Sequence, residues 1–125
     1  MRVFGDLGSG DCQKVKLTAD YLELQYEWVP VDLMKGETRT PEFLARNPFG
    51  QIPVVDFPDG RRLAQSNAIV RRLARGSALM PEEAFDQAKC DELMFWEQYS
   101  HEAYVAMGTR WSSCFGTKAS SSATV

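Results

Sequence analysis

Apolar and polar residues alternate over short stretches near the start of the chain, which predicts a strand followed by a helix. The three residues after the initial methionine form the predicted strand. The Gly-rich stretch Gly8–Asp11 supplies turn formers, and Asp11 is the expected cap of a helix over about 12–24. Residues 26–31 alternate again and are rich in β-forming side chains. Because Pro30 cannot donate a ladder hydrogen bond, this second strand is expected at a sheet edge.

The next 40 residues predict a short helix, a hairpin and a further helix. Thr40 and Pro41 are suited to the cap and first position of a helix that ends near residue 46. Strands over 54–57 and 62–64, separated by a Pro-Asp-Gly turn, are typical of an antiparallel hairpin. Ser66 is the expected cap of a helix over 67–74, which a glycine two residues later would end. The order βαβ, α, ββα predicts an α/β domain of the thioredoxin-like class.

The chain then changes character twice, which predicts three segments. Residues 1–80 form the thioredoxin-like domain, and residues 81–108 have the pattern of one long helix. Residues 109–125 contain eight Ser or Thr and no acidic residue, so we expect an irregular tail there. The abrupt change suggests that the chain is truncated.

Composition excludes several classes of function. Hydrophobic residues make up 44% of the 125 positions and charged residues 25%, as in ordinary soluble proteins. A net charge of −3 without a basic block argues against nucleic acid as a partner. No apolar run is long enough to span a membrane, and the start of the chain lacks a secretory signal. The three cysteines form no metal-ligand spacing, which indicates reduced thiols in a cytoplasmic protein without a metal.

The start of the first helix is the expected site of chemistry. A helix N-terminus favours negative charge, and here it carries Ser9 and Cys12. Dithiol exchange is not supported, because serine occupies the position where a redox domain places its nucleophilic thiol. A hydroxyl there is suited instead to stabilising a thiolate supplied by a ligand. The ordinary alternatives are a turn serine and a buried, unreactive cysteine.

Several motifs together resemble a known family. The segments that carry the resemblance are Gly8–Val15, Asn47–Val55, Leu63–Ile69 and, in the long helix, Phe95–Glu102. In this order and spacing they resemble the N-terminal domain and the first C-terminal helix of cytosolic glutathione S-transferases, most closely the bacterial, theta, delta and beta types. The resemblance covers residues 1–108 and implies transfer of glutathione, as co-substrate, to a small hydrophobic electrophile. It also implies a role in detoxification, a homodimer, and an all-helical C-terminal domain of which residues 81–108 are the first helix.

The resemblance assigns roles to individual residues. Ser9 matches the hydroxyl that stabilises the glutathione thiolate, and Cys12 matches the reactive cysteine of beta-type relatives. Gln51 and Ile52 precede Pro53, which the family holds in cis so that the backbone of residue 52 pairs with the cysteinyl part of glutathione.

The same resemblance places Gln65 and Ser66 at the γ-glutamyl end, where the Ser66 hydroxyl and the adjacent N–H groups would receive the α-carboxylate. Lys35 and, less directly, Arg39 match the loop that contacts the glycyl carboxylate.

Three functions remain open at this point. The first is conjugation that depends on Ser9, and the second is a noncatalytic glutathione-binding or protein-interaction module. The third is a thiol transferase that depends on Cys12. The acceptor substrate is not predicted, because most of the helices that shape its pocket in the family have no counterpart in this sequence.

Overall fold

A computed structural model describes residues 1–106 of the chain. These residues belong to two compact units, the first comprising Met1–Pro81 and the second beginning at Glu82. The tail predicted for residues 109–125 lies outside the described residues. Each unit is described by itself.

The first unit is built on a four-stranded sheet with the order β2-β1-β3-β4. The strands are β1 (Arg2–Gly5), β2 (Glu27–Pro30), β3 (Val54–Asp56) and β4 (Arg62–Ala64). β1 pairs in parallel with β2 and antiparallel with β3, and β3 pairs antiparallel with β4. β2 lies at the edge of the sheet, as predicted from its proline.

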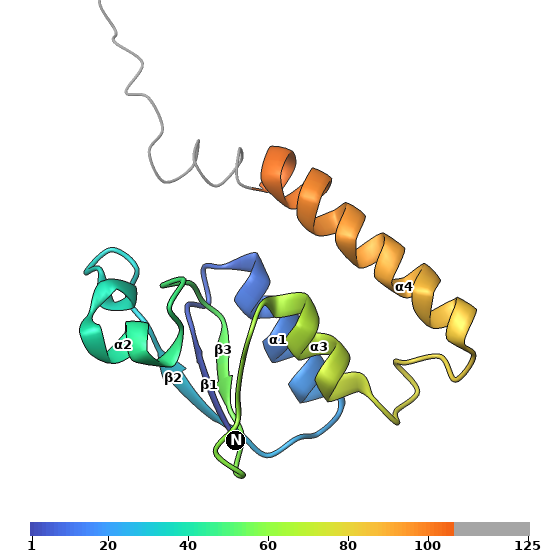
Figure 1. The fold of residues 1–125 in the computed structure, drawn as a ribbon, viewed down its shortest axis with the longest axis horizontal. Coiled ribbons are helices and arrows are strands. Elements are labelled where there is room, and N and C mark those ends of the chain that lie inside the picture. The colour runs from blue at the N-terminus through green and yellow to red at the C-terminus, as the bar shows by residue number, and fades with distance from the viewer. Residues whose placement is uncertain (107–125) are drawn as a thin grey trace, which may run out of the picture. The chain divides into compact units, whose positions relative to one another are not determined.

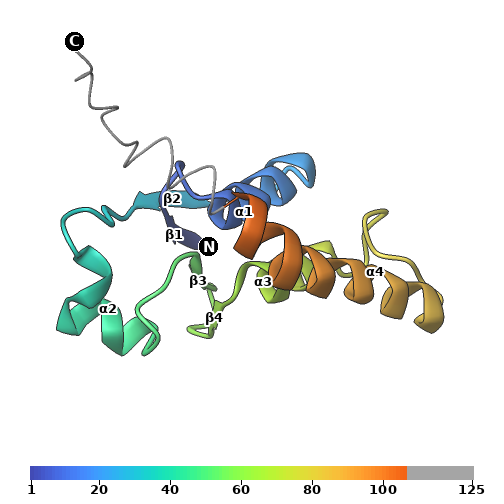
Figure 2. The same ribbon diagram turned by 90° about the horizontal axis from the view of Figure 1, so that it is seen from above.

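Three helices cover the sheet: α1 (Gly10–Tyr21), α2 (Pro41–Arg46) and α3 (Ser66–Ala74), with a 3₁₀ turn over Glu37–Arg39 ahead of α2. Figures 1 and 2 show α1 and α3 side by side on one face of the sheet and α2 beyond the other. The element order confirms the predicted thioredoxin-like fold.

Neighbouring residues of each central strand supply the two faces of the core, because successive side chains of a strand point to opposite faces. Val3 of β1 and Val55 of β3 pack with α1 and α3 through Val15 and Ile69. Their neighbours in the strands belong to a second cluster on the α2 face, whose buried residues are Phe4, Val31, Phe43 and Val54. The sheet therefore has a buried layer on each face.

The observed helix boundaries agree only in part with those predicted from the sequence. The Thr40 hydroxyl accepts a hydrogen bond of 3.2 Å from the Phe43 N–H, so α2 begins as predicted. α1 ends at Tyr21, earlier than the predicted residue 24. Asp11 and Ser66 are not caps: Asp11 is the second residue of α1, and Ser66 is the first residue of α3. Both predictions were wrong because α1 begins two residues and α3 one residue earlier than predicted; the two side chains bond to each other instead.

The second unit begins with α4 (Ala84–Trp96) and continues over Glu97–Ala106 with the wider turns of a π-helix. The helix starts later than the predicted residue 81, since the Glu83 carboxylate accepts hydrogen bonds from the Phe85 and Asp86 N–H groups and acts as its cap. Within the described part of the chain, we find no helix whose length and apolar content would let it cross a membrane.

Candidate functional site

Strand register brings three loops to one end of the sheet. Phe4 of β1 pairs with Val54 of β3, and Val54 pairs in turn with Ala64 of β4. The loop after β1, the Pro53 peptide before β3 and Gln65 after β4 all adjoin this row of pairs. Three of the segments that carry the family resemblance, spread over residues 8–69, therefore meet at the same end of the sheet.

The loop between β1 and α1 holds Ser9 at the cap position of α1. The Ser9 N–H donates to the Asp6 carbonyl at 3.0 Å, and the Gly8 N–H donates to the Asp6 carboxylate at 2.8 Å. The Ser9 hydroxyl makes no capping bond to its own helix, and the residue is 9% exposed. The loop therefore fixes a hydroxyl at the N-terminus of a 12-residue helix, where the helix dipole favours an anion.

Cys12 has the surroundings of a structural cysteine. Its side chain is completely buried in the first turn of α1. Burial raises the pKa of the Cys12 thiol, while hydrogen bonds from the Asp6 backbone and the Ser9 side chain lower it by less. Reactive cysteines are exposed and have lowered pKa values, so neither property of a nucleophile is present here.

The approach to β3 is organised by a side chain that sequence reasoning missed. Asn47, 3% exposed, donates from Nδ2 to the Gln51 carbonyl at 2.8 Å and accepts from the Phe49 N–H at 3.2 Å. It thereby closes the turn that leads to the Ile52–Pro53 peptide, which is cis as the resemblance implies. An Asn-Pro pair signals a turn, but not that the amide spans it.

The two candidate loop cations differ in their surroundings. Lys35 is 76% exposed, and its ammonium pairs with the Asp32 carboxylate at 3.2 Å. The Arg39 guanidinium instead lies against Gly50, where the lack of a side chain leaves room for it: a Cβ there would be 2.8 Å from Nη1. Arg39 is therefore held beside the turn that precedes Pro53.

Gln65 and Ser66 occupy the junction between β4 and α3. Gln65 is exposed and has a φ of 72°, a left-handed conformation that costs a non-glycine residue about 1–3 kcal/mol. Ser66 is 4% exposed, and its hydroxyl donates to the Asp11 carboxylate at 2.7 Å. In this arrangement the single proton of the Ser66 hydroxyl is directed at the Asp11 carboxylate.

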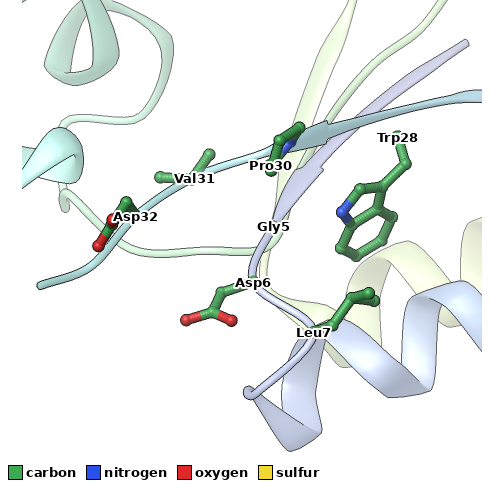
Figure 3. A pocket seen from close by; sticks show the side chains of 7 residues that line it. All are labelled: Gly5, Asp6, Leu7, Trp28, Pro30, Val31 and Asp32. Atoms are coloured by element: carbon green, nitrogen blue, oxygen red, sulfur yellow. The ribbon is translucent and has the colours of Figure 1, made fainter.

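A cleft of about 500 Å³ opens beside the Ser9 loop. Figure 3 shows Leu7 and Trp28 at one end and the carboxylates of Asp6 and Asp32 at the other. Gly5, Pro30 and Val31 complete its lining. Among the described residues, no group of three potential ligands is placed to hold a metal ion.

Comparison with known proteins identifies the family. The model of the glutathione S-transferase N-terminal domain matches residues 9–75. The crystal structure of a glutathione S-transferase from Pseudomonas fluorescens Pf-5 aligns with a TM-score of 0.89 and 44% identity, over 92% of this chain and 57% of that one. The chain therefore belongs to the glutathione S-transferase family.

Two further relatives extend the comparison. Maleylacetoacetate isomerase from Rhizobium meliloti strain 1021 is 40% identical over 85 residues, which are 66% of this chain and 39% of the relative. A glutathione transferase homologue from Drosophila mojavensis, solved with bound glutathione, aligns with a TM-score of 0.74 and 30% identity, over 78% of this chain and 46% of that one. The chain spans about half the length of these relatives, or less.

Proposed function

We propose that this protein binds glutathione at the end of the sheet where the three loops meet and activates its thiol for transfer to a small hydrophobic electrophile. The observation that carries the proposal is the strand register, which gathers Ser9, the Ile52–Pro53 peptide and the Gln65–Ser66 pair. The family match and a glutathione-bound relative support the same ligand.

Ser9 is the residue proposed to hold the thiolate. A free thiol with a pKa of about 8.5 is only about 3% ionised at pH 7. A hydrogen bond to an ionised group contributes about 1.5–3 kcal/mol, which corresponds to about one to two pKa units. The helix N-terminus adds to this stabilisation. Ser9 is preferred over Cys12, since the Cys12 thiol is buried and its pKa is raised.

We assign a partner on this chain to each remaining part of the glutathione tripeptide. The Ile52 backbone, which the family resemblance assigns to the cysteinyl unit, is proposed to pair with it, and Gln51 adjoins it in sequence. Gln65 and Ser66, with the N-terminus of α3, are proposed for the γ-glutamyl end. We assign the glycyl carboxylate to Arg39 in preference to Lys35, because Lys35 is already paired with Asp32.

The cleft beside the Ser9 loop is the proposed position of the electrophile. Its Leu7, Trp28 and Val31 side chains offer an apolar surface next to the loop that holds Ser9. We propose that the second unit is the first helix of an all-helical C-terminal domain, as the family resemblance implies. We also propose that the protein is a cytoplasmic homodimer. The free thiols of Cys12 and Cys90 are typical of that reducing compartment.

A conjugation assay tests the proposal. Purified protein, glutathione and a generic chloronitroaromatic electrophile should give a thioether at a rate that Ser9→Ala lowers at least about tenfold. Cys12→Ala and the matched control Cys90→Ala should retain the rate. Glutathione binding without turnover would support the noncatalytic module instead. Loss of the rate only in Cys12→Ala would support a thiol transferase.

A further inference from the structure

The first turns of α1 and α3 are joined by a small polar cluster that the proposed chemistry does not use. The Asp11 carboxylate accepts from the Ser66 hydroxyl at 2.7 Å and pairs with the Lys14 ammonium at 3.0 Å. The same ammonium contacts Asn67 Oδ1 at 3.5 Å. The Asp11 and Lys14 side chains are 24% and 29% exposed, so water screens these contacts only in part.

This cluster contacts Ser66, which directly follows Gln65 in the chain. Gln65 has a left-handed backbone, and such a conformation persists only when neighbouring contacts fix it. On its C-terminal side those contacts include the Asp11–Ser66 bond, the hydrogen bond from the Ile69 N–H to the Gln65 carbonyl, and the buried Ile69 side chain. The Asp11 carboxylate is therefore placed to set where the Gln65–Ser66 pair lies relative to α1 and to Ser9 at its start.

We infer that Asp11 is a positioning residue for the γ-glutamyl end of glutathione, acting through Ser66, and that Lys14 keeps the Asp11 charge from opposing a bound carboxylate. This inference rests on the proposed function. In this inference the Ser66 hydroxyl donates its proton to Asp11, and the backbone N–H groups at the start of α3 bind the α-carboxylate of the ligand. An uncompensated carboxylate at this point would repel the α-carboxylate of the ligand, whereas the ion pair with Lys14 offsets that repulsion.

Titration calorimetry with reduced glutathione tests the inference through a set of matched variants. Asp11→Ala should raise the Kd about tenfold, while Asp11→Asn, whose amide oxygen still accepts from Ser66, should stay within about threefold of the unmodified protein. Asp20→Ala is the control, since Asp20 pairs with Lys16 farther along α1. It removes the same charge from the same helix and should leave the Kd unchanged.

A double-mutant cycle separates positioning from general stability. If Asp11 acts through Ser66, adding Asp11→Ala to Ser66→Ala should change the Kd by less than about twofold, because the interaction is already lost. Fully additive effects, or an Asp11→Ala protein that binds as the unmodified protein does, would overturn the inference. Failure of the unmodified protein to bind glutathione would instead overturn the proposed function, and the inference with it.

A second pair of variants decides the question if Asp11→Ala does not fold. Lys14→Met leaves the Asp11 charge uncompensated and should raise the Kd about fivefold. Lys16→Met removes the equivalent cation from the Asp20 pair and should have no effect on the Kd. Equal affinities for these two variants would overturn the role given to the cluster.

Discussion

Asn47 offers a direct test of how the glutathione-facing turn is built. Its amide joins the Phe49 N–H to the Gln51 carbonyl, with distances of 3.2 and 2.8 Å, and only 3% of the residue is exposed. Asn47→Ala removes both bonds at once and leaves their two backbone partners without this amide. We therefore expect the variant to be less stable than the unmodified protein.

The size of the effect follows from these two hydrogen bonds. Each contributes about 1 kcal/mol net, so Asn47→Ala should lower the free energy of unfolding by about 2 kcal/mol. For a unit of this size about 1 kcal/mol shifts the Tm by roughly 4–8 °C, which predicts a fall of roughly 8–16 °C. The Kd for glutathione should rise as well, because the turn precedes the proposed cysteinyl contact.

Urea unfolding monitored by tryptophan fluorescence measures this change. Gln51→Ala is the control, since it removes a similar amide from an exposed side chain in the same turn and keeps the backbone carbonyl. It should alter stability by less than about 0.5 kcal/mol. The reasoning is refuted if Asn47→Ala and Gln51→Ala are equally stable.

Three other predictions concern charge and close packing. Because the pKa of the Cys12 thiol is raised on folding, the unfolded chain loses this proton first as pH rises. Stability should therefore fall above about pH 9, and Cys12→Ala should remove that part of the fall in urea titrations. Gly5→Ala should cost about 1–3 kcal/mol in the same assay, since its Cβ would be 2.9 Å from the Cys12 sulfur and the Trp28 ring. Calorimetry should show weaker glutathione binding in Arg39→Ala than in Lys35→Ala; equal losses would contradict the preference for Arg39.

Local chemistry explains why much of the fold could be predicted. Thr40 and Pro41 determine the start of α2 through a cap and a preset backbone angle, and both act within one turn of chain. Pro30 places β2 at the edge because its nitrogen cannot donate to a neighbouring strand. Features of this kind depend on residues adjacent in sequence, so a single sequence contains them.

The missed features depend on contacts between distant segments. Asp11 and Ser66 each have the residue type of a helix cap, and only their approach across 55 positions turns them toward each other. Residue type also gives no sign that Gln65 has a left-handed backbone. The pair between Lys35 and Asp32, by contrast, is local in sequence, whereas Arg39 differs from Lys35 because its guanidinium lies against Gly50. The sequence therefore shows where the family motifs lie along the chain, but not which groups their side chains bond to.

The ionisation of bound glutathione tests the central claim most directly. Ultraviolet difference spectroscopy of the protein–glutathione complex, titrated from pH 5 to pH 10, gives the pKa of the bound thiol. With Ser9 in place we expect a value about two units below that of the free thiol, and Ser9→Ala should return it to within about half a unit of free glutathione. A bound thiol that titrates like free glutathione in the unmodified protein would contradict the account.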